Sequence, residues 1–167
     1  ADSLFSETEA NYIALKTGAK KAATQPRVLT EIKLNDAWYV PGGKSFMSTL
    51  IQDANAHYCW EGDTSLGSLP LSFEQVYKTA ADADYWLNVL FAKNKADISK
   101  LDKRYMNFKA FKNTTIYNNN LQVTDKGGNA YWETGLICPD LILSDMVKIF
   151  HPELGKDTTL NYYKKLE

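Results

Sequence analysis

The segment from Trp38 to Ser45 holds the strongest candidates for ligand contact in the sequence. It combines two aromatic side chains, a proline-glycine-glycine turn and a lysine at the expected end of a strand and start of a helix. Such a turn presents backbone N–H groups and aromatic faces at the edge of an α/β sheet, where ligands usually bind. The contacts expected from this segment are Trp38, Tyr39, Gly42, Gly43 and Lys44.

The chemistry of this turn has two interpretations. Gly43-Lys44-Ser45 matches the end of a nucleotide phosphate-binding loop, but Trp38 stands where that motif needs its first glycine, which excludes the nucleotide. A helix N-terminus beside Lys44 could still bind a carboxylate or another anion. The competing interpretation is an ordinary helix cap beside a solvated lysine.

Other catalytic patterns are weak. The sequence has no G-x-S-x-G motif, which argues against a serine hydrolase. His57 and His151 each follow an expected helix end, where the helix dipole favours a histidine, and Asp82 with Asp84 fits a turn. We therefore assign no acid or base and no cofactor.

Composition limits the remaining classes of function. With 167 residues, 44% of them hydrophobic, the chain can bury a core of its own. A formal net charge of −1, without a block of like charge, argues against nucleic-acid binding. No apolar run approaches the roughly 18 residues of a membrane span. Cys59 and Cys138 lack metal or redox spacing and are either two buried thiols or one disulfide.

Helical and strand patterns alternate along the chain, which predicts a largely parallel sheet flanked by helices, a three-layer αβα fold. The helix before the first strand is unusual in such a fold, and the polar segment 118–134 is longer than an ordinary loop. Expected helices cover 3–23, 44–54, 72–81, 96–111 and 139–150, expected strands lie at 28–32, 58–60, 84–89 and 114–117, and 61–69 is an expected loop.

Eight segments spread over nearly the whole chain carry a family resemblance. They are Trp38–Met47, Gly67–Glu74, Ala83–Asn88, Phe108–Asn113, Tyr117–Asn120, Gly128–Glu133, Pro139–Leu141 and Ile149–Leu154. Their order and spacing resemble the C-terminal lobe of the iron-siderophore, haem and vitamin B12 class (class III) of ABC-transporter periplasmic substrate-binding proteins, in the form common among Bacteroidetes. No single segment is diagnostic.

The resemblance implies a two-lobed protein that binds a metal chelate in the cleft between its lobes. Residues 1–25 would form the interlobe connecting helix and 26–167 the C-terminal lobe, with the N-terminal lobe absent from this chain. The full-length protein would be periplasmic and lipid-anchored, and would not be an enzyme. By its position in the L-S-x-E helix start, Glu74 would dock on the ABC permease.

The same resemblance places the ligand against the loops at the strand ends. Aromatic faces grip flat or aryl-rich chelates, which adds Trp60 and Trp132 to the expected contacts, with Asn119 and Tyr131 from the polar segment 118–134. Trp86 lies inside a strand and is expected in the core. A siderophore, haem or cobalamin remains open as the ligand. The alternatives are a small α/β enzyme acting on an anionic substrate at Lys44 and an interaction module.

Overall fold

A five-stranded sheet forms the centre of the computed structural model, which describes residues 1–167. Its strand order is β3-β1-β5-β6-β7, and all neighbours are parallel except β6 and β7. The mostly parallel sheet predicted from the sequence is thereby confirmed. The strands are β1 (Arg27–Thr30), β3 (His57–Tyr58), β5 (Tyr85–Leu87), β6 (Ile116–Asn118) and β7 (Lys164–Lys165).

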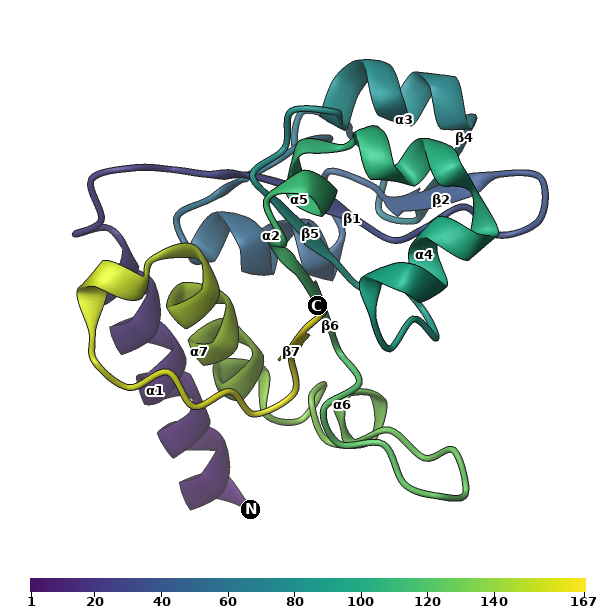
Figure 1. The fold of residues 1–167 in the computed structure, drawn as a ribbon. Helices are drawn as coiled ribbons and strands as arrows, with labels where there is room; N and C mark the ends of the chain where they lie inside the picture. Colours follow the sequence, from purple (N-terminus) through teal and green to yellow (C-terminus); the bar gives the residue numbers. More distant parts are fainter.

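Helices cover both faces of this sheet and so make three layers (Figure 1). On one face α2 and α7 pack together, with α1 outside them, and on the other lie α3, α4 and α5. The α-helices are α1 (Asp2–Ala19), α2 (Phe46–Asp53), α3 (Phe73–Ala80), α4 (Lys95–Leu101), α5 (Lys109–Lys112), α6 (Ala130–Glu133) and α7 (Pro139–Phe150), and the 3-10 helices are η1 (Lys103–Asn107) and η2 (Pro152–Leu154).

The hydrophobic core lies in two parts, one on each face of the sheet. Neighbouring residues of a strand point to opposite faces, so Val28 and Leu29 of β1 enter different clusters, and so do Trp86 and Leu87 of β5. All four side chains are fully buried. The expected core position of Trp86 is therefore confirmed.

A second sheet of two antiparallel strands, which the sequence did not predict, packs on the α3 side. It pairs β2 (Trp38–Pro41) with β4 (Ser68–Leu71), so that Trp38 lies opposite Leu71. The expected loop 61–69 is wrong at its end, because Ser68 and Leu69 belong to β4. This ribbon buries Trp38 and Val40 in the cluster that also contains Phe73 of α3.

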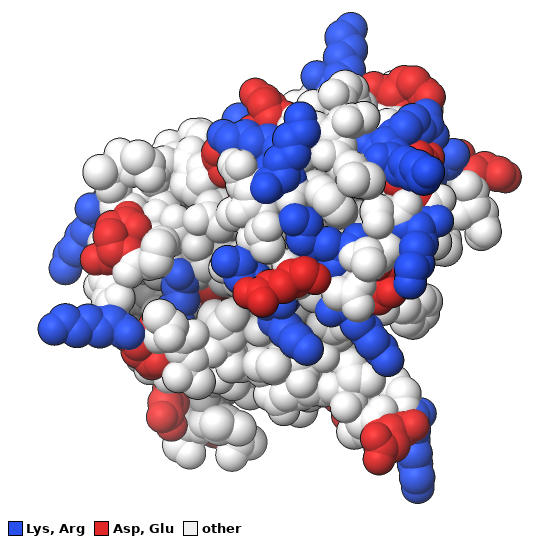
Figure 2. Space-filling model, viewed as in Figure 1, with Lys and Arg blue, Asp and Glu red and all other residues white.

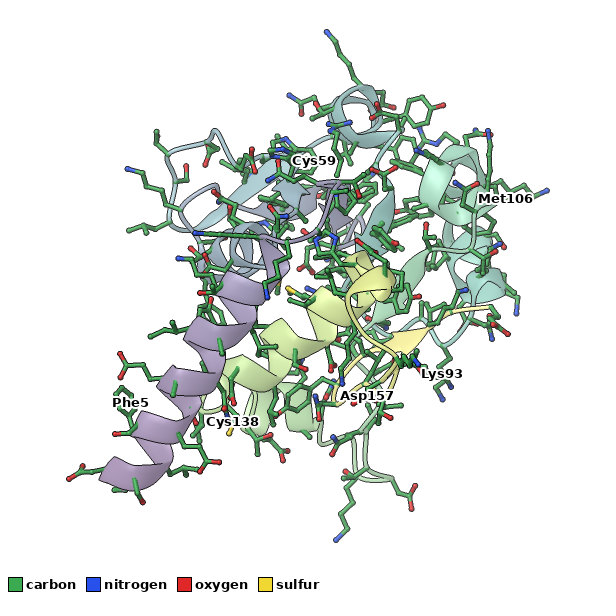
Figure 3. The ribbon with its side chains drawn as sticks, turned by 90° about the vertical axis from the view of Figure 1, so that its left-hand side faces the viewer. Phe5, Cys59, Lys93, Met106, Cys138 and Asp157 are labelled. Atoms are coloured by element: carbon green, nitrogen blue, oxygen red, sulfur yellow. The ribbon has the colours of Figure 1, made fainter.

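Helix α1 lies along α7 (Figures 1 and 3). The hydroxyl of Tyr12 donates to Asp53 of α2 at 2.5 Å, and Lys16 pairs with the same carboxylate at 3.3 Å. Phe5 is 72% exposed and projects away from the body of the molecule (Figure 3). The helix ends at Ala19, before the predicted residue 23, and no helix of the structure is both long and apolar enough to span a bilayer.

Local capping explains where other elements differ from the sequence prediction. The expected helix 96–111 breaks into α4, η1 and α5, because Asp102 is extended (φ −163°) and its carboxylate accepts from the N–H of Arg104. Segment 118–134 contains the short helix α6. Cys59 and Cys138 are free thiols, so the disulfide is not found, and both are partly buried where the sequence predicted buried thiols. Figure 3 shows them in different parts of the molecule.

Candidate functional site

A pocket of about 720 Å³ lies at the carboxyl ends of three neighbouring parallel strands. Residues that follow β1, β5 and β6 form its floor, and the rest of the wall comes from the 123–132 segment and from β7. We call it the strand-end pocket. Its lining residues are Glu31, Asn88, Leu90, Phe91, Lys93, Asn119, Asn120, Val123, Thr124, Asp125, Gly127, Asn129, Trp132 and Lys164. Ligands of open α/β sheets bind at this edge.

Strained backbone is concentrated at this pocket. Six residues other than glycine have positive φ, and three of them, Glu31 (67°), Asn88 (63°) and Leu90 (53°), line the pocket. A left-handed conformation costs a residue with a side chain roughly 1 to 3 kcal/mol and persists where its surroundings fix it. Glu31 is fixed by its N–H, which donates to Leu87 O at 2.9 Å, and by its carbonyl, which accepts from the Trp86 indole at 2.7 Å.

Asn118, at the end of β6, fixes the segment that follows β5. Its side-chain amide donates to the carbonyls of Leu90 (2.8 Å) and Ala92 (2.9 Å), and its Oδ1 accepts from the N–H of Val89 at 3.0 Å. Asn118 is fully buried. These bonds determine the course of the chain from Val89 to Ala92, which carries two lining residues of the pocket.

Asn120 adds a free polar atom to the same wall. Its amide donates to Ala92 O at 3.1 Å, whereas its Oδ1 is buried without a hydrogen-bond partner. A buried acceptor of this kind is costly unless something satisfies it. A donor group on a bound ligand could do so.

Glu31 is the acidic group at the base of the pocket, and the sequence analysis did not identify it. Burial raises the pKa of its carboxyl from 4.5 to about 7, while a hydrogen bond with Asn88 opposes part of that shift. No lysine or arginine forms an ion pair with it. The side chain therefore changes charge close to neutral pH.

Three of the predicted contacts lie at this pocket. Asn119 and Trp132 line it, and Trp132 is 62% exposed, so its ring is available to a ligand. Tyr131 is buried beneath it, with edge-on contacts to the rings of Trp132 and Tyr163 at 4.8 and 5.8 Å. Burial raises the pKa of Tyr131 to about 12. Tyr131 therefore supports the wall in this structure.

Trp38 is not at the surface, so its predicted ligand contact is wrong. It is fully buried, its indole N–H donates to Thr30 O at 3.0 Å, and its ring stacks on Trp86 at 5.8 Å. The physical reason is the alternation of β2, in which Trp38 and Val40 point inward and Tyr39 points outward.

The glycine turn is a packing site and not an anion cradle. The N–H of Gly42 donates to Gly67 O, that of Gly43 to the Asp63 carboxylate, and that of Lys44 to Ser65 O. Ser45 caps α2 with its hydroxyl. Because the turn donates its N–H groups to the chain itself, the interpretation as an anion-binding enzyme site loses its basis.

The space around the two glycines explains why they are there. A Cβ on Gly42 would lie 2.3 Å from Ser65 O, and one on Gly43 would lie 2.1 Å from Asp63 O. Both glycines are buried. They allow the loop 61–67 to approach closely, and the predicted ligand contacts at Gly42 and Gly43 are corrected accordingly.

The remaining predicted contacts lie away from the strand-end pocket. Tyr39 is 49% exposed on the β2–β4 ribbon, opposite Pro70, and Lys44 is exposed at the start of α2. Trp60 is partly buried and packs edge-on against Tyr58 at 5.8 Å. None of the three lines the pocket.

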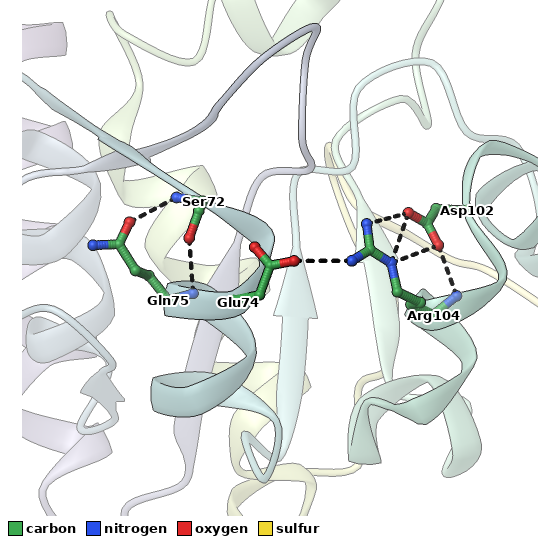
Figure 4. A network of polar contacts seen from close by, with 5 residues as sticks. All are labelled: Ser72, Glu74, Gln75, Asp102 and Arg104. Atoms are coloured by element: carbon green, nitrogen blue, oxygen red, sulfur yellow. Dashed lines mark hydrogen bonds and ion pairs between the residues drawn. The ribbon is translucent and has the colours of Figure 1, made fainter.

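Glu74 is exposed in the first turn of α3, in the position the sequence predicted (Figure 4). A capping box between Ser72 and Gln75 begins this helix. The carboxylate of Glu74 pairs with Arg104 at 3.1 Å, and Arg104 also pairs with Asp102 at 2.7 Å. Its own backbone N–H and the positive charges of Arg104 and Lys33 lower the pKa of Glu74. It is therefore a carboxylate at neutral pH.

Figure 2 shows charged side chains of both signs on one face of the molecule, with Lys and Arg more numerous than Asp and Glu over its right-hand half. The formal net charge of the whole chain is −1. The side chains that line the strand-end pocket are the candidates for ligand recognition there.

The layered sheet with a pocket at its strand ends is the fold of one lobe of a periplasmic binding protein. A periplasmic haem-binding protein, RhuT from Roseiflexus, superimposes with a TM-score of 0.68 at 18% identity, over 92% of this chain and 56% of its own. A possible iron-binding periplasmic solute-binding protein from Staphylococcus epidermidis gives 0.66 at 19% identity, over 90% and 54%.

In sequence, the chain is similar to a curated protein from Methanocaldococcus jannaschii, the uncharacterized lipoprotein MJ0878. The two are 25% identical over 164 residues, which cover 96% of this chain and 37% of that relative. No protein-family model matches the sequence. The chain thus spans little more than a third of this relative and about half of the solved chains.

Proposed function

We propose that this chain is the C-terminal lobe, of the form common among Bacteroidetes, of the substrate-binding component of an ABC importer for iron complexes such as a siderophore or haem. The observation that carries the proposal is the strand-end pocket. It lies at the ligand-binding edge of the sheet, and its wall exposes Trp132 and Phe91 beside four asparagines. The solved proteins with this fold include haem-binding and possible iron-binding examples.

The proposal makes α1 the helix that connects two lobes. Its N-terminal part exposes Leu4, Phe5 and Ile13, a set of apolar side chains that a second lobe could cover. The chain covers only part of each relative, which supports a missing N-terminal lobe. The strand-end pocket would then be one wall of a cleft, and the ligand would contact both lobes.

Glu74 is the proposed contact with the permease. It is exposed and ionised, and an arginine on a partner could replace Arg104 as its ion-pair partner. Exchange of one surface ion pair for another suits reversible docking. The lipoprotein name of the archaeal relative and the periplasmic names of the solved proteins support a periplasmic, lipid-anchored full-length protein.

The test is ligand capture by the full-length protein. We expect the purified protein to carry, or to take up, an iron chelate that is visible in its absorption spectrum and identifiable by mass spectrometry. Titration with haemin, with a ferric tricatecholate and with cyanocobalamin then separates the ligand classes. Failure of all three to bind would refute the proposed function, and binding of cyanocobalamin alone would reassign the ligand within the same class of protein.

A further inference from the structure

We propose that Glu31 binds the ligand as a neutral acid, so that the strand-end pocket selects a chelate with an anionic oxygen group and takes up a proton when that chelate binds above neutral pH. This inference rests on the proposed function. It assigns a role to a residue that neither the sequence patterns nor the comparisons identify.

The first observation is the fixed position of Glu31. Its left-handed backbone is held by Trp86 and Leu87, as described above, so the side chain leaves β1 at a defined point of the pocket floor. Strain of this kind at a pocket is often associated with function.

The second observation is the polar environment of the carboxyl. Asn88 Oδ1 accepts a hydrogen bond from the buried Tyr163 hydroxyl at 2.9 Å. The amide NH₂ of Asn88 lies 3.8 Å from the Met47 sulfur and also hydrogen-bonds to the carboxyl of Glu31. No cation neutralises the carboxyl. A protonated carboxyl in these surroundings carries an O–H donor that a ligand oxygen can accept.

The third observation is the pair of lysines on the rim. Lys93, labelled in Figure 3, and Lys164 of β7 line the same pocket, and neither takes part in an ion pair of the structure. Two unpaired ammonium groups attract an anion. An anion held there favours the protonated form of Glu31 and opposes its carboxylate.

The other groups that face Glu31 do not titrate in the same range. They are Tyr58 at the end of β3, Tyr131 of α6 and Tyr163 before β7, whose pKa values burial raises above the ordinary tyrosine value. Asp125 is an exposed acid on the rim. Glu31, whose own pKa lies near 7, is therefore the group at this pocket whose charge changes around neutrality.

The experiment measures dissociation constants of the full-length protein between pH 6 and 9, with haemin and a ferric tricatecholate as anionic probes and cyanocobalamin as a probe without net charge. We expect affinity for an anionic probe to fall by up to about tenfold per pH unit above pH 7, the limit for one linked proton. Glu31→Gln should keep the affinity of the low-pH form at every pH. Glu133→Gln, an exposed glutamate outside the pocket, is the matched control and should retain the wild-type profile.

The possible outcomes distinguish the proposed role of Glu31 from the proposed binding function. A flat wild-type profile, a slope that persists in Glu31→Gln, or an affinity that rises with pH would overturn the role of Glu31 while leaving the binding function intact. Tight binding of cyanocobalamin alone would also overturn the role of Glu31 and leave the binding function intact. If no probe binds at any pH, the proposed function fails and this inference fails with it.

Discussion

The hydroxyl of Tyr163 donates a hydrogen bond to Oδ1 of Asn88 at 2.9 Å, and both residues are buried. This bond joins the C-terminal segment of the chain to the end of β5. It fixes the orientation of the Asn88 amide and, through it, the surroundings of Glu31. The last residues of the chain therefore help to build the strand-end pocket, although they lie 75 positions from Asn88.

Removal of that hydroxyl tests the bond. Tyr163→Phe would leave Asn88 Oδ1 buried without a donor, and we expect the free energy of unfolding to fall by about 1 to 3 kcal/mol. Urea denaturation of the two proteins measures the difference. Tyr39→Phe, which changes an exposed tyrosine on β2, is the matched control and should be neutral. Equal stability of the Tyr163 variant and the wild type would show that the bond contributes nothing.

The pKa of Glu31 makes a prediction for stability that needs no ligand. The folded-state pKa of about 7 lies above the ordinary value of 4.5, so the stabilising contribution is complete below pH 4.5 and is lost as pH rises through 7. The full shift corresponds to roughly 3 kcal/mol, an upper limit for a partly buried group. We expect wild type to lose stability between pH 5 and 8 relative to Glu31→Gln.

Urea denaturation of both proteins at pH 5 and pH 8 measures this loss. The variant should retain some slope, because burial also raises the pKa of Asp145. The acids with lowered pKa values, such as Asp84 and Asp102, act at lower pH and leave this window undisturbed. Parallel profiles for the two proteins would contradict the raised pKa.

The layered fold is largely predictable from the sequence because its helices and strands depend on local patterns. The amphipathic spacing and cap of α3, the proline at the start of α7 and the apolar strands β1 and β5 are all local signals. The pairing of β2 with β4 joins residues about 30 positions apart, and no local signal announces it. The predicted ligand contact of Trp38 is wrong for that reason, because the burial of this residue depends on the ribbon that the pairing forms.

Alanine variants of two tryptophans distinguish a residue of the core from a residue of the ligand site. Trp38→Ala removes a fully buried ring and should lower the free energy of unfolding by about 3 to 5 kcal/mol. Trp132→Ala removes a largely exposed ring at the pocket and should leave stability within about 0.5 kcal/mol. In the full-length protein, Trp132→Ala should weaken chelate binding by about 1 to 3 kcal/mol.

Denaturation curves and ligand titration of both variants measure these effects. Unchanged affinity of the Trp132 variant would remove this residue from the proposed site. A Trp38 variant as stable as the wild type would contradict the burial of that ring.

Only some of the residues that line the strand-end pocket are predictable from the sequence. The length of the polar segment 118–134 indicates a functional loop, and the family resemblance selects Asn119 and Trp132 within it as ligand contacts. Glu31 was missed because a single acid in an apolar stretch gives no pattern, and its role appears only when β1, β5 and β6 lie side by side. Its left-handed backbone has no sequence signature either, since glutamate is not a residue that favours it.

Gly43 tests the corrected role of the proline-glycine-glycine turn. Gly43→Ala places a Cβ 2.1 Å from Asp63 O, a backbone atom, so the loop 61–67 must move. We expect lower thermal stability in this chain. Gly62→Ala, where a Cβ meets nothing within 4 Å, is the matched control and should change the melting temperature much less. A Gly43 variant that melts like the Gly62 variant would mean that the close approach is unimportant.

Glu74 tests the proposed docking surface. Its ion pair with Arg104 is exposed to solvent, so its loss should affect folding little. In the full-length protein, Glu74→Ala should therefore spare chelate affinity and stability but reduce uptake through the permease, because it removes a charged contact with the partner. Glu74→Gln, which keeps the shape and loses the charge, should reduce uptake in the same way.

A control variant at Glu133 and a variant of the ion-pair partner Arg104 make the test of Glu74 more specific. Glu133→Ala changes another exposed glutamate and should transport normally. Arg104→Ala frees Glu74 from its internal partner, so uptake should be maintained or increased, whereas a structural role for the pair would make both variants equally defective. Uptake assays with ligand-loaded protein distinguish these results. Normal uptake by Glu74→Ala would show that the permease docks elsewhere on the molecule.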